Sequence, residues 1–330
     1  MTFTRALITG AGGFVGARLA EQLLDRGLQP TLLVRPGSDH WRLAHLRAAA
    51  EVLEVDLRDL RAVHRALDST RPECVFHLAA HGAYSWHDDP RAILEINLMG
   101  TLSLLEAATQ SSVSTFVHAG SSSEYGFKDH APSESEAPEP NSYYAVAKTA
   151  ATLLGQYMAA QHDLRVTTLR LSSVYGPWEE PRRLVPTLIS RGLCGELPPL
   201  VEPETGRDFV FVDDVCDAFL AVATADRPTS AIYNVGSGIQ TTVRELVEVA
   251  RRELVIEIAP HWGAYPARPW DARVWVSDPR RIQRDLGWHP SHDLHRGFSA
   301  TVAWLREQPD VWERYGLLDR HPARPADASA

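Results

Sequence analysis

Two residues with acid–base chemistry, Tyr144 and Lys148, lie four positions apart in a segment whose apolar residues recur at helical spacing. On a helix this spacing places both side chains on one face. A free tyrosine titrates near ~10 and is a poor base at neutral pH, but a neighbouring ammonium group stabilises its phenolate. The hydroxyl of Ser121 follows the fifth predicted strand, and parallel α/β sheets hold ligands at the carboxyl ends of their strands. The three residues predict proton transfer to or from a substrate oxygen at this edge of the sheet.

A glycine-rich turn with the pattern G-x-x-G-x-x-G connects the first predicted strand to the first predicted helix. Glycine allows the tight turn and lets backbone N–H groups approach a pyrophosphate, whose charge is favoured by the helix N-terminus. The place of the triplet, between a strand and an amphipathic helix, favours a dinucleotide site over a purely structural turn. We therefore expect cofactor contacts from Gly10, Gly13, Phe14, Val15 and Gly16.

The residue that closes the second predicted strand is Arg35. A carboxylate at this position binds the 2′-hydroxyl of the adenosine ribose, whereas a cation accommodates a 2′-phosphate. With no acid at that point and Ser38 close behind, the sequence favours NADP(H). NAD(H) is the alternative if Arg35 only stacks on adenine or faces water. After the third predicted strand come Asp56 and Leu57, and the Asp56 carboxylate either accepts a hydrogen bond from the adenine amino group or caps the next turn.

Short apolar runs alternate with helical patterns over the first half of the chain. Such runs are typical of buried parallel strands, and the segments between them have the apolar spacing of helices packed on a sheet. The order predicts an α/β fold with a doubly wound parallel sheet of the Rossmann type. The predicted strands are Ala6–Thr9, Thr31–Val34, Glu51–Val55, Cys74–Ala79, Thr115–Ala119 and Arg165–Leu171, and the predicted helices are Val15–Arg26, Leu60–Leu67, Ala92–Ala108 and Tyr144–Gln161.

The second half of the chain predicts a smaller, substrate-binding lobe. Beyond Gly176, prolines interrupt the periodicity into shorter elements, so we expect this lobe to be rich in loops. A buried-strand pattern at Ala231–Val235 indicates that the chain returns to the sheet, which makes the two domains interleaved. The predicted organisation is a cofactor domain of residues 1–172 with a return of about 208–236, a substrate lobe of residues 173–207 and 237–318, and a mobile tail of residues 319–330.

Charge and cysteine content exclude some partners and compartments. The 330 residues include 33 Lys and Arg against 42 Asp and Glu, a formal net charge of −9, which repels the phosphate backbone of a nucleic acid. Cys74, Cys194 and Cys216 are odd in number and far apart, as is typical of reduced thiols in a cytoplasmic protein. We expect no run that approaches the ~20 apolar residues of a membrane span, and therefore no membrane partner.

Several short motifs accompany the glycine turn and the Tyr144/Lys148 pair. They are His77-Leu78-Ala79-Ala80, Asn97 before Gly100-Thr101, Ser121–Gly126, Tyr175-Gly176-Pro177, Arg207–Val215 and Leu286-Gly287-Trp288. Over roughly residues 5–305, the chain resembles the extended short-chain dehydrogenase/reductase family, in its NAD(P)-dependent nucleotide-sugar epimerase/dehydratase/reductase branch. The resemblance implies that Tyr144 is the general acid/base, that Lys148 holds the nicotinamide ribose and lowers the tyrosine pKa, and that Ser121 hydrogen-bonds the reacting sugar oxygen.

The same resemblance implies further contacts. Besides Tyr144 and Lys148, it places Leu78, Ala79 and Ala80 against the cofactor. Arginines are implied to grip the diphosphate of a nucleotide-sugar substrate, for which bidentate guanidinium contacts are suited. A homodimer, formed through helices that flank the sheet, including the one with Tyr144, is also implied. The implied substrate contacts are Ser121, Ser122, Ser123, Ser173, Arg207 and Arg268.

Departures from the family pattern bear on the reaction. Members that remove water from the sugar follow the catalytic hydroxyl with acidic residues, at positions that here are Ser122 and Ser123, and Glu124 lies one place too late. Dehydration is therefore disfavoured. A reductase consumes external NADPH whereas an epimerase keeps NAD bound, so Arg35 favours a 4-ketoreductase acting at C4 of a nucleotide-linked keto-deoxysugar. An NAD-retaining 4-epimerase is the first alternative, and a non-catalytic, dinucleotide-sensing regulator is the second.

Other polar residues have a structural interpretation. The histidines between His77 and His87 lack metal-ligand spacing, and no metal site is predicted. Asp213 and Asp214 precede the predicted helix Val215–Ala223, and we expect them to cap it. Asn97 is expected to bond backbone groups that position the catalytic strand.

Overall fold

The computed structural model describes residues 3–84, 86–225, 231–265 and 274–317. Arg268 and the tail predicted at residues 319–330 lie outside these ranges.

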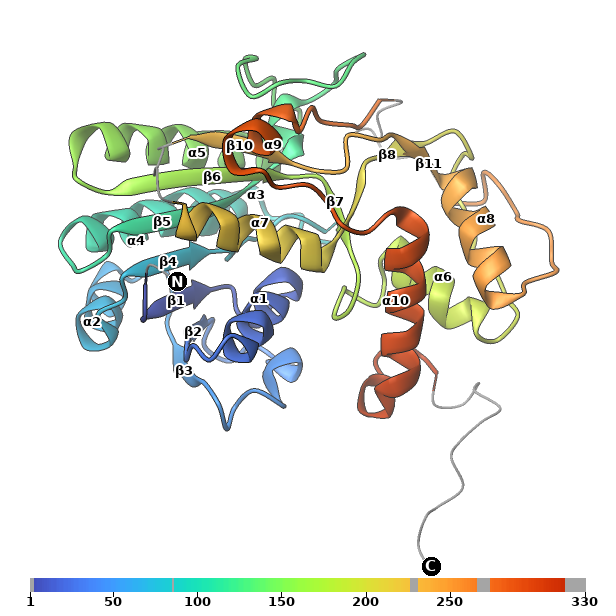
Figure 1. Ribbon diagram of the computed structural model, residues 1–330, viewed down its shortest axis with the longest axis horizontal. Coiled ribbons are helices and arrows are strands. Elements are labelled where there is room, and N and C mark those ends of the chain that lie inside the picture. Colours follow the sequence, from blue (N-terminus) through green and yellow to red (C-terminus); the bar gives the residue numbers. More distant parts are fainter. Residues whose placement is uncertain (1–2, 85, 226–230, 266–273, 318–330) are drawn as a thin grey trace, which may run out of the picture.

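Seven parallel strands form the central sheet, in the spatial order β3-β2-β1-β4-β5-β6-β10 (Figure 1). All strands except the edge strand β3 are almost completely buried, because helices cover both faces of the sheet. The doubly wound parallel sheet predicted from the sequence is thereby confirmed. The strands are β1 (Ala6–Thr9), β2 (Thr31–Val34), β3 (Glu51–Glu54), β4 (Cys74–His77), β5 (Thr115–Ser121), β6 (Arg165–Leu171) and β10 (Ile232–Val235).

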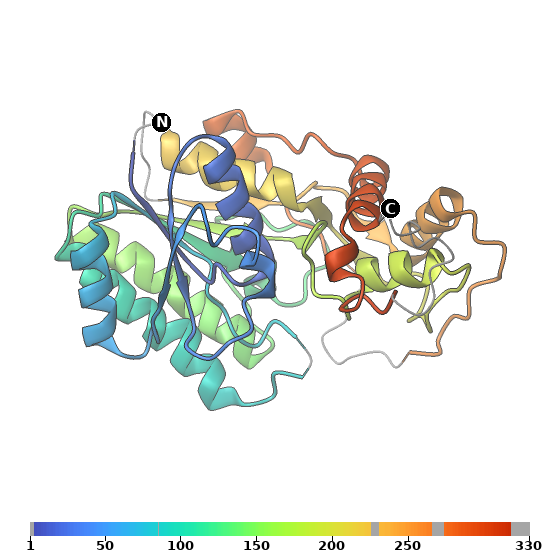
Figure 2. The ribbon, with the colours of Figure 1, turned by 90° about the horizontal axis from the view of Figure 1, so that it is seen from below.

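Two layers of helices enclose this sheet, as Figure 2 shows from below. On one face lie α1 (Phe14–Asp25), α7 (Val212–Thr224) and, beside β10, α9 (Arg280–Leu286). On the other lie α2 (Leu60–Thr70), α4 (Gly100–Thr109) and α5 (Tyr143–Gln161). Neighbouring strand residues point to opposite faces, so Ile8 packs in the core beneath α1 and α7 whereas Leu7 packs in the core beneath α2 and α4.

The helix predicted over Ala92–Ala108 is interrupted by a π-helical turn. Helix α3 (Pro90–Leu94) leads into the π-helix Glu95–Met99, which continues as α4. The wide turn carries the buried Asn97, whose side chain accepts from the His81 N–H at 2.7 Å and donates to the His81 carbonyl at 2.6 Å. Asn97 therefore bonds backbone groups as expected, but it fixes the loop after β4 and not the catalytic strand β5.

The helical run Pro90–Thr109 is long and apolar enough, by length and composition alone, to cross a membrane. Its mean hydropathy of 1.2 corrects the expectation that no run would approach a membrane span. In the structure this run packs beside α2 and α5 as part of one helical layer of the domain, so the apolar residues serve the core.

A second lobe is built on three helices, α6 (Leu184–Gly192), α8 (Val243–Leu254) and α10 (Leu294–Glu307). Helix α8 buries a helical stripe of apolar residues against α6 and α10, and most of the described chain between these helices consists of loops, turns and short strands. Two short strand pairs accompany these helices: β7 (Ser173–Tyr175) pairs with β9 (Phe209–Phe211), and β8 (Gly206–Arg207) pairs with β11 (Thr241–Thr242). The molecule also contains the 3-10 helices η1 (Trp41–Leu43), after β2, η3 (Ser122–Tyr125), after β5, and η4 (Pro309–Val311), after α10.

The two parts of the molecule are interleaved along the chain (Figure 1). After β6 the chain builds β7, α6 and β8, then returns through β9 and α7 to β10. There Ile232 pairs with Thr168 and Val235 with Leu171, which makes β10 the outermost strand beside β6.

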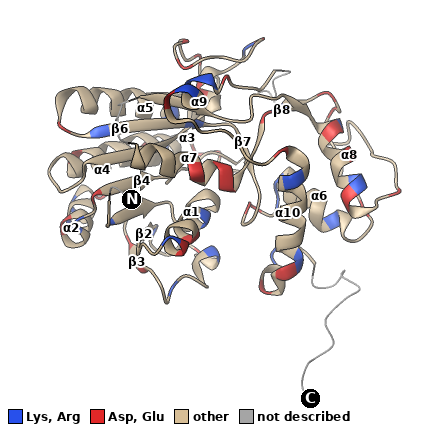
Figure 3. Ribbon diagram, viewed as in Figure 1, with Lys and Arg blue, Asp and Glu red and all other residues tan. Residues whose placement is uncertain are grey.

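The expected capping by Asp213 and Asp214 is corrected by the structure. Helix α7 begins at Val212, so both aspartates lie within its first turn and neither caps it. Figure 3 shows acidic residues in red at this end of α7. Asp213 forms a two-pronged ion pair with Arg18 of α1, whose Nη2 donates at 2.9 Å. The buried Asp214 accepts hydrogen bonds from the backbone and hydroxyl of Ser291, at 3.0 and 2.6 Å. They tie α7 to neighbouring segments, while their charge also suits a helix N-terminus.

Candidate active site

The glycine turn between β1 and α1 has no room for a side chain at Gly10 or Gly16. Gly10 has φ of +68°, and a Cβ there would lie 2.5 Å from the Ala79 nitrogen. A Cβ at Gly16 would lie 2.3 Å from the Gly10 carbonyl oxygen. Gly13 is the exposed N-cap of α1 and supplies no side-chain cap, so the N–H groups of the first turn, which includes Phe14 and Val15, have no side-chain cap. This tight cradle at a helix N-terminus fits the diphosphate of a dinucleotide.

Next to this turn, the end of β4 forms a second wall. The Leu78 N–H donates to the Thr9 carbonyl at 3.1 Å, and the Ala79 N–H donates to the Thr9 hydroxyl at 3.2 Å. Leu78 and Ala79 are half-buried and Ala80 is exposed. The three residues predicted to border the cofactor therefore lie just beyond the carboxyl end of β4, with Leu78 and Ala79 directly beside Gly10.

Arg35 follows β2 at the same edge and its side chain is exposed. The Ser38 hydroxyl donates to the Arg35 carbonyl at 2.7 Å, which closes the turn. Beyond β3, Asp56 accepts from the backbone and guanidinium of Arg58, and these bonds, with a smaller contribution from the charge of Arg35, lower the pKa of the Asp56 carboxyl. The neighbouring Leu57 is nearly buried.

Ser121, Tyr144 and Lys148 meet at the carboxyl end of β5. Ser121 is the last residue of that strand, and its hydroxyl lies 2.7 Å from the hydroxyl of Ser123. Tyr144 and Lys148 lie in the first turns of α5, where the Lys148 ammonium is 5.9 Å from the centre of the Tyr144 ring. The ammonium also donates to the Ala119 carbonyl at 2.9 Å, which anchors the buried lysine to β5. The structure therefore brings together the three groups predicted to do the chemistry.

Burial sets the protonation states of this pair. Desolvation raises the pKa of Tyr144 to about 12, a hydrogen bond with Ser121 opposes this rise, and the charge of Glu124 adds to it. Desolvation lowers the pKa of Lys148 to about 8, and the charge of Glu124 opposes that fall. Near pH 7 the tyrosine is therefore a neutral phenol, able to donate a proton, and the lysine is a cation.

Two buried histidines lie next to this site. The ring of His77 on β4 is hydrogen-bonded on both sides, to the hydroxyls of Thr9 at 2.7 Å and Thr101 at 2.8 Å. It stacks on His118 of β5, with 5.2 Å between the ring centres. Burial lowers the pKa of His77 to about 3, and the positive charge of Lys148 adds to this effect, so the ring is neutral. Within the described ranges, no group of three His, Cys, Asp or Glu side chains is arranged to hold a metal ion.

The residues predicted to contact substrate surround the same edge. Ser122 and Ser123 lie in η3 directly after Ser121, and Ser123 also donates its N–H to the Ser121 hydroxyl at 3.1 Å. Ser173 begins β7 and donates its N–H to the Asp208 carbonyl at 2.8 Å. Arg207 lies in β8, with its guanidinium 5.5 Å from the centre of the Trp275 ring. The remaining predicted contact, Arg268, falls outside the described ranges.

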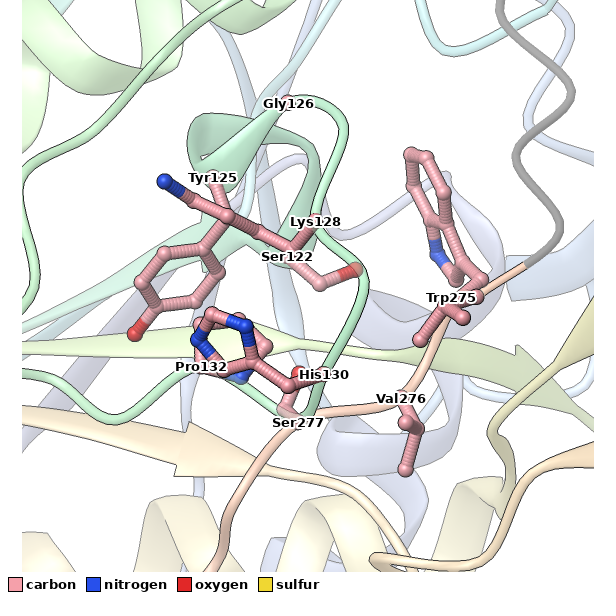
Figure 4. Close-up of a pocket in the computed structure, with 10 residues that line it drawn as sticks. Ser122, Tyr125, Gly126, Lys128, His130, Pro132, Trp275, Val276 and Ser277 are labelled. Atoms are coloured by element: carbon pink, nitrogen blue, oxygen red, sulfur yellow. The ribbon is translucent and has the colours of Figure 1, made fainter.

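A small pocket opens beside Ser122. Figure 4 shows Trp275 and Val276 on one side of it and Tyr125 and His130 on the other. The pocket is lined by two segments that are distant in sequence, residues between Ser122 and Pro132, which follow β5, and residues 274–277.

Sequence reasoning missed two residues whose charge or hydroxyl acts on Tyr144. Tyr84, in the loop after β4, and Arg183, the N-cap residue of α6, are both close enough to influence the pKa of its phenol. Arg183 is also paired with the buried Glu179 at 3.5 Å. The adjacent basic pair Arg182/Arg183, shortly after Tyr175-Gly176-Pro177, is a sequence signal that could have pointed to this position.

Comparison with known proteins agrees with this geometry. The sequence profile of the "NAD dependent epimerase/dehydratase family" matches residues 6–236. The chain is 32% identical to a dTDP-glucose 4,6-dehydratase of Streptomyces griseus, with 94% of this chain and 96% of the relative covered. It is 30% identical to a UDP-glucose 4-epimerase of Mycolicibacterium smegmatis, with 92% and 99% covered.

Solved structures are similar as well. The UDP-glucose 4-epimerase of Thermus thermophilus, in a complex with NAD, superposes with a TM-score of 0.82 at 31% identity, covering 92% of this chain and 99% of that one. The family resemblance predicted from the motifs is thus confirmed by sequence and by fold. The chain belongs to the NAD dependent epimerase/dehydratase family, which is a family of enzymes.

Proposed function

We propose that the protein is an NADP(H)-dependent oxidoreductase that acts at C4 of a nucleotide-linked sugar and works as a 4-ketoreductase. The observation that carries the cofactor choice is Arg35, an exposed cation directly after β2 with no ion-pair partner among the described residues. A guanidinium at this place favours the 2′-phosphate of NADP(H). A reductase consumes reduced cofactor from solution, and NADPH is the form that this position favours.

The substrate class is supported by the relatives and by the site. Their printed names include dTDP-glucose and UDP-glucose, two sugars linked to a nucleoside diphosphate. Arg207, at the border of the substrate lobe, supplies a guanidinium of the kind that binds a diphosphate.

The side chains of this protein would carry out the proton transfer of the reaction. When bound, the nicotinamide cofactor supplies the hydride. Tyr144, held as a phenol by burial, donates its proton to the sugar oxygen as that oxygen gains negative charge. The Lys148 cation stabilises the phenolate that remains, and the Ser121 hydroxyl holds the same sugar oxygen in line.

Loss of water from the sugar is poorly supported by the residues present. An elimination needs an acid for the leaving hydroxyl and a base for the neighbouring C–H. Ser122 and Ser123 offer only hydroxyls. The carboxylate of Glu124 is fully buried and its oxygens already accept bonds from Ser121, Thr152 and Arg170.

A second candidate, an NAD-retaining 4-epimerase, is favoured by the similarity to UDP-glucose 4-epimerases, one of which was solved with NAD. The same three catalytic residues would first take the proton from the sugar hydroxyl and later return it.

The identity and the amount of the cofactor that stays bound during purification distinguish the reductase from the epimerase. The purified protein would be denatured and the released nucleotide identified, and then dTDP- and UDP-linked 4-keto-6-deoxyglucose would be tested for oxidation of added NADPH. Release of little cofactor, with NADPH oxidised in proportion to sugar reduced, would support the reductase. Tightly held NAD together with interconversion of UDP-glucose and UDP-galactose would replace it with the epimerase.

The cofactor preference can be tested by changing Arg35 to aspartate. The carboxylate would repel a 2′-phosphate and accept the ribose 2′-hydroxyl, so we expect the KM for NADPH to rise by at least ~10-fold with little rise for NADH. Steady-state kinetics with both cofactors measure this. Arg61→Asp, the same charge change on an exposed residue of α2, is the control. Equal effects on the two cofactors in Arg35→Asp would refute the proposed preference.

We also propose that the protein is a homodimer through the outer face of α5. Tyr143, Val146, Leu153 and Tyr157 follow one another at helical spacing on that face and are 43–61% exposed, which is unusual for residues so apolar. Because the stripe lies on one straight helix, the same face of a second copy fits it about a two-fold axis.

Replacing Leu153 with arginine should therefore convert the dimer to a monomer, because a charge would be buried in the apolar contact. Light scattering coupled to size-exclusion chromatography measures the mass. Ile239→Arg, at a position of the other lobe that is 66% exposed against 54% for Leu153, should leave the dimer intact. A wild-type protein of monomeric mass would rule out this interface.

The cysteines support a proposal about compartment. Cys74 and Cys216 are buried and Cys194 is partly buried, and all three are free thiols. Free thiols are typical of proteins in a reducing compartment, and we propose that this enzyme works in the cytoplasm.

A further inference from the structure

A fully buried ion pair lies directly below the catalytic serine. The Arg170 guanidinium of β6 donates through Nε to the Glu124 carboxylate at 2.9 Å, and the two side chains are 2% and 0% exposed. Removing two charges from water is costly, and a well-packed apolar pair is often as stable. Stability alone is therefore a weak reason for charges at this place, and the contacts of Glu124 indicate another.

Glu124 connects β5 and α5, which carry the three catalytic residues, to the neighbouring strand β6. Its Oε1 accepts from the Ser121 N–H at 3.0 Å and from the Thr152 hydroxyl of α5 at 3.1 Å, while Oε2 accepts from Arg170 of β6. The bond to Ser121 is reciprocated within a capping box, because the Ser121 hydroxyl accepts from the Ser123 N–H. The position of the Ser121 hydroxyl thus depends on the backbone that Glu124 holds.

The carboxylate also fits closely against the strand itself. A Cβ at Gly120 would lie 2.8 Å from Glu124 Oε1, so the absence of a side chain there lets the charge approach the end of β5. Glu124 and Gly120 together place a negative charge under the reacting groups without exposing it to substrate.

The charge of Glu124 acts on both members of the acid–base pair. It raises the pKa of Tyr144 and that of Lys148. Arg183 and Tyr84 also face Tyr144, and the neutral rings of His77 and His118 lie on the side of Lys148. Arg170 itself lies over the ring of Tyr125, 4.5 Å from its centre, and Tyr125 in turn is near Glu134.

We propose that Glu124, with Arg170 as its counter-ion, is a positioning residue of the active site. It holds the Ser121 backbone by a hydrogen bond, and its buried negative charge favours the protonated forms of Tyr144 and Lys148. The inference rests on the proposed function only in that these three residues carry the acid–base chemistry. Glu124 itself touches neither substrate nor cofactor, because its carboxylate is enclosed by protein.

The Glu124→Gln variant tests this directly. Glutamine has the same shape and its oxygen can accept the same bonds from Ser121 and Thr152, but it carries no charge. The ionisation of Tyr144 is followed by the ultraviolet absorbance of the phenolate as a function of pH, with saturating NADP⁺. The same titration is recorded for the matching protein that also carries Tyr144→Phe, and it is subtracted to remove the signal of the other tyrosines. We expect the midpoint to fall by about one pH unit, because a negative charge near the phenol has been removed.

Two further variants keep the test decisive. Thr152→Val removes a hydrogen bond to Glu124 without changing charge, and it should move the midpoint by much less than Glu124→Gln. If Glu124→Gln leaves Arg170 uncompensated and does not fold, the double variant Glu124→Gln/Arg170→Gln removes both charges, and it should still show a lowered midpoint. A Tyr144 midpoint equal to that of the wild type in the folded Glu124 variants overturns the proposal. No sugar is present in the titration, so a failure to find a sugar substrate would leave this result intact.

Discussion

Replacing Tyr144 with phenylalanine is expected to lower kcat by about 10²–10⁴-fold, with little change in cofactor binding. The substitution removes one oxygen and leaves the ring, so the packing of α5 is preserved. What is lost is the proton that the phenol gives to the sugar oxygen and the hydrogen bond with Ser121. Turnover of a 4-keto sugar nucleotide, followed by NADPH absorbance, measures the effect.

A matched control stands next in the chain. Tyr143 is 60% exposed at the first position of α5, and Tyr143→Phe makes the same chemical change away from the trio. It should keep nearly full activity. If Tyr144→Phe retained wild-type kcat, the assignment of Tyr144 as proton donor would be wrong.

Replacing Lys148 with methionine is expected to lower kcat by about 10²-fold or more, a loss similar to that of a general acid. It should also weaken cofactor binding. The variant removes the cation that stabilises the phenolate, and leaves the Ala119 carbonyl without its donor. Parallel measurements of kcat and of cofactor affinity separate the two losses.

The chain contains only one other lysine, Lys128, which is largely buried, pairs with Glu139 and lines the pocket beside Ser122. Arg61→Met, which removes a positive charge from an exposed position of α2, is the control, and should leave kcat close to the wild-type value. Unchanged turnover in Lys148→Met would contradict the role given to the buried ammonium.

The strands of the sheet could be predicted well because a parallel strand that is buried on both faces gives a short, continuous run of mainly apolar residues in the sequence. Ala6–Thr9, Thr31–Val34 and Arg165–Leu171 were predicted with the bounds that the structure shows. Strand β5 is longer than predicted and continues to Ser121, since Gly120 and Ser121 still pair with β6 although neither is apolar. Pairing with a neighbour, which periodicity does not record, decides where a strand ends.

The second lobe was less predictable for a related reason. Its helices pack on one another through residues that are distant in sequence, so α8 and α10 lack the regular alternation with strands that marks the first domain. Nearby prolines also suggested interruption, but Pro186 lies in the first turn of α6, where its missing N–H costs no helical hydrogen bond, and α8 and α10 contain no proline.

Within the site, the sequence identified the groups that a motif places at fixed spacing and missed those that only the fold brings together. Tyr144 and Lys148 are one helical turn apart, and the structure places Ser121 beside them. Glu124 was noted only as an acid out of place, because its partner Arg170 belongs to another strand. No local pattern shows that these two charges meet.

The outermost strand of the sheet has a consequence for biosynthesis. Because β10 follows α6 and α7 along the chain, a ribosome has already produced α6, the first helix of the second lobe, before β6 gains its last neighbour. During that interval the nascent chain presents an unsatisfied row of amide and carbonyl groups along β6, an edge on which other chains can pair. A fragment ending at residue 172 would keep that open edge permanently, so expression of the cofactor-binding part alone should give aggregates and call for a chaperone.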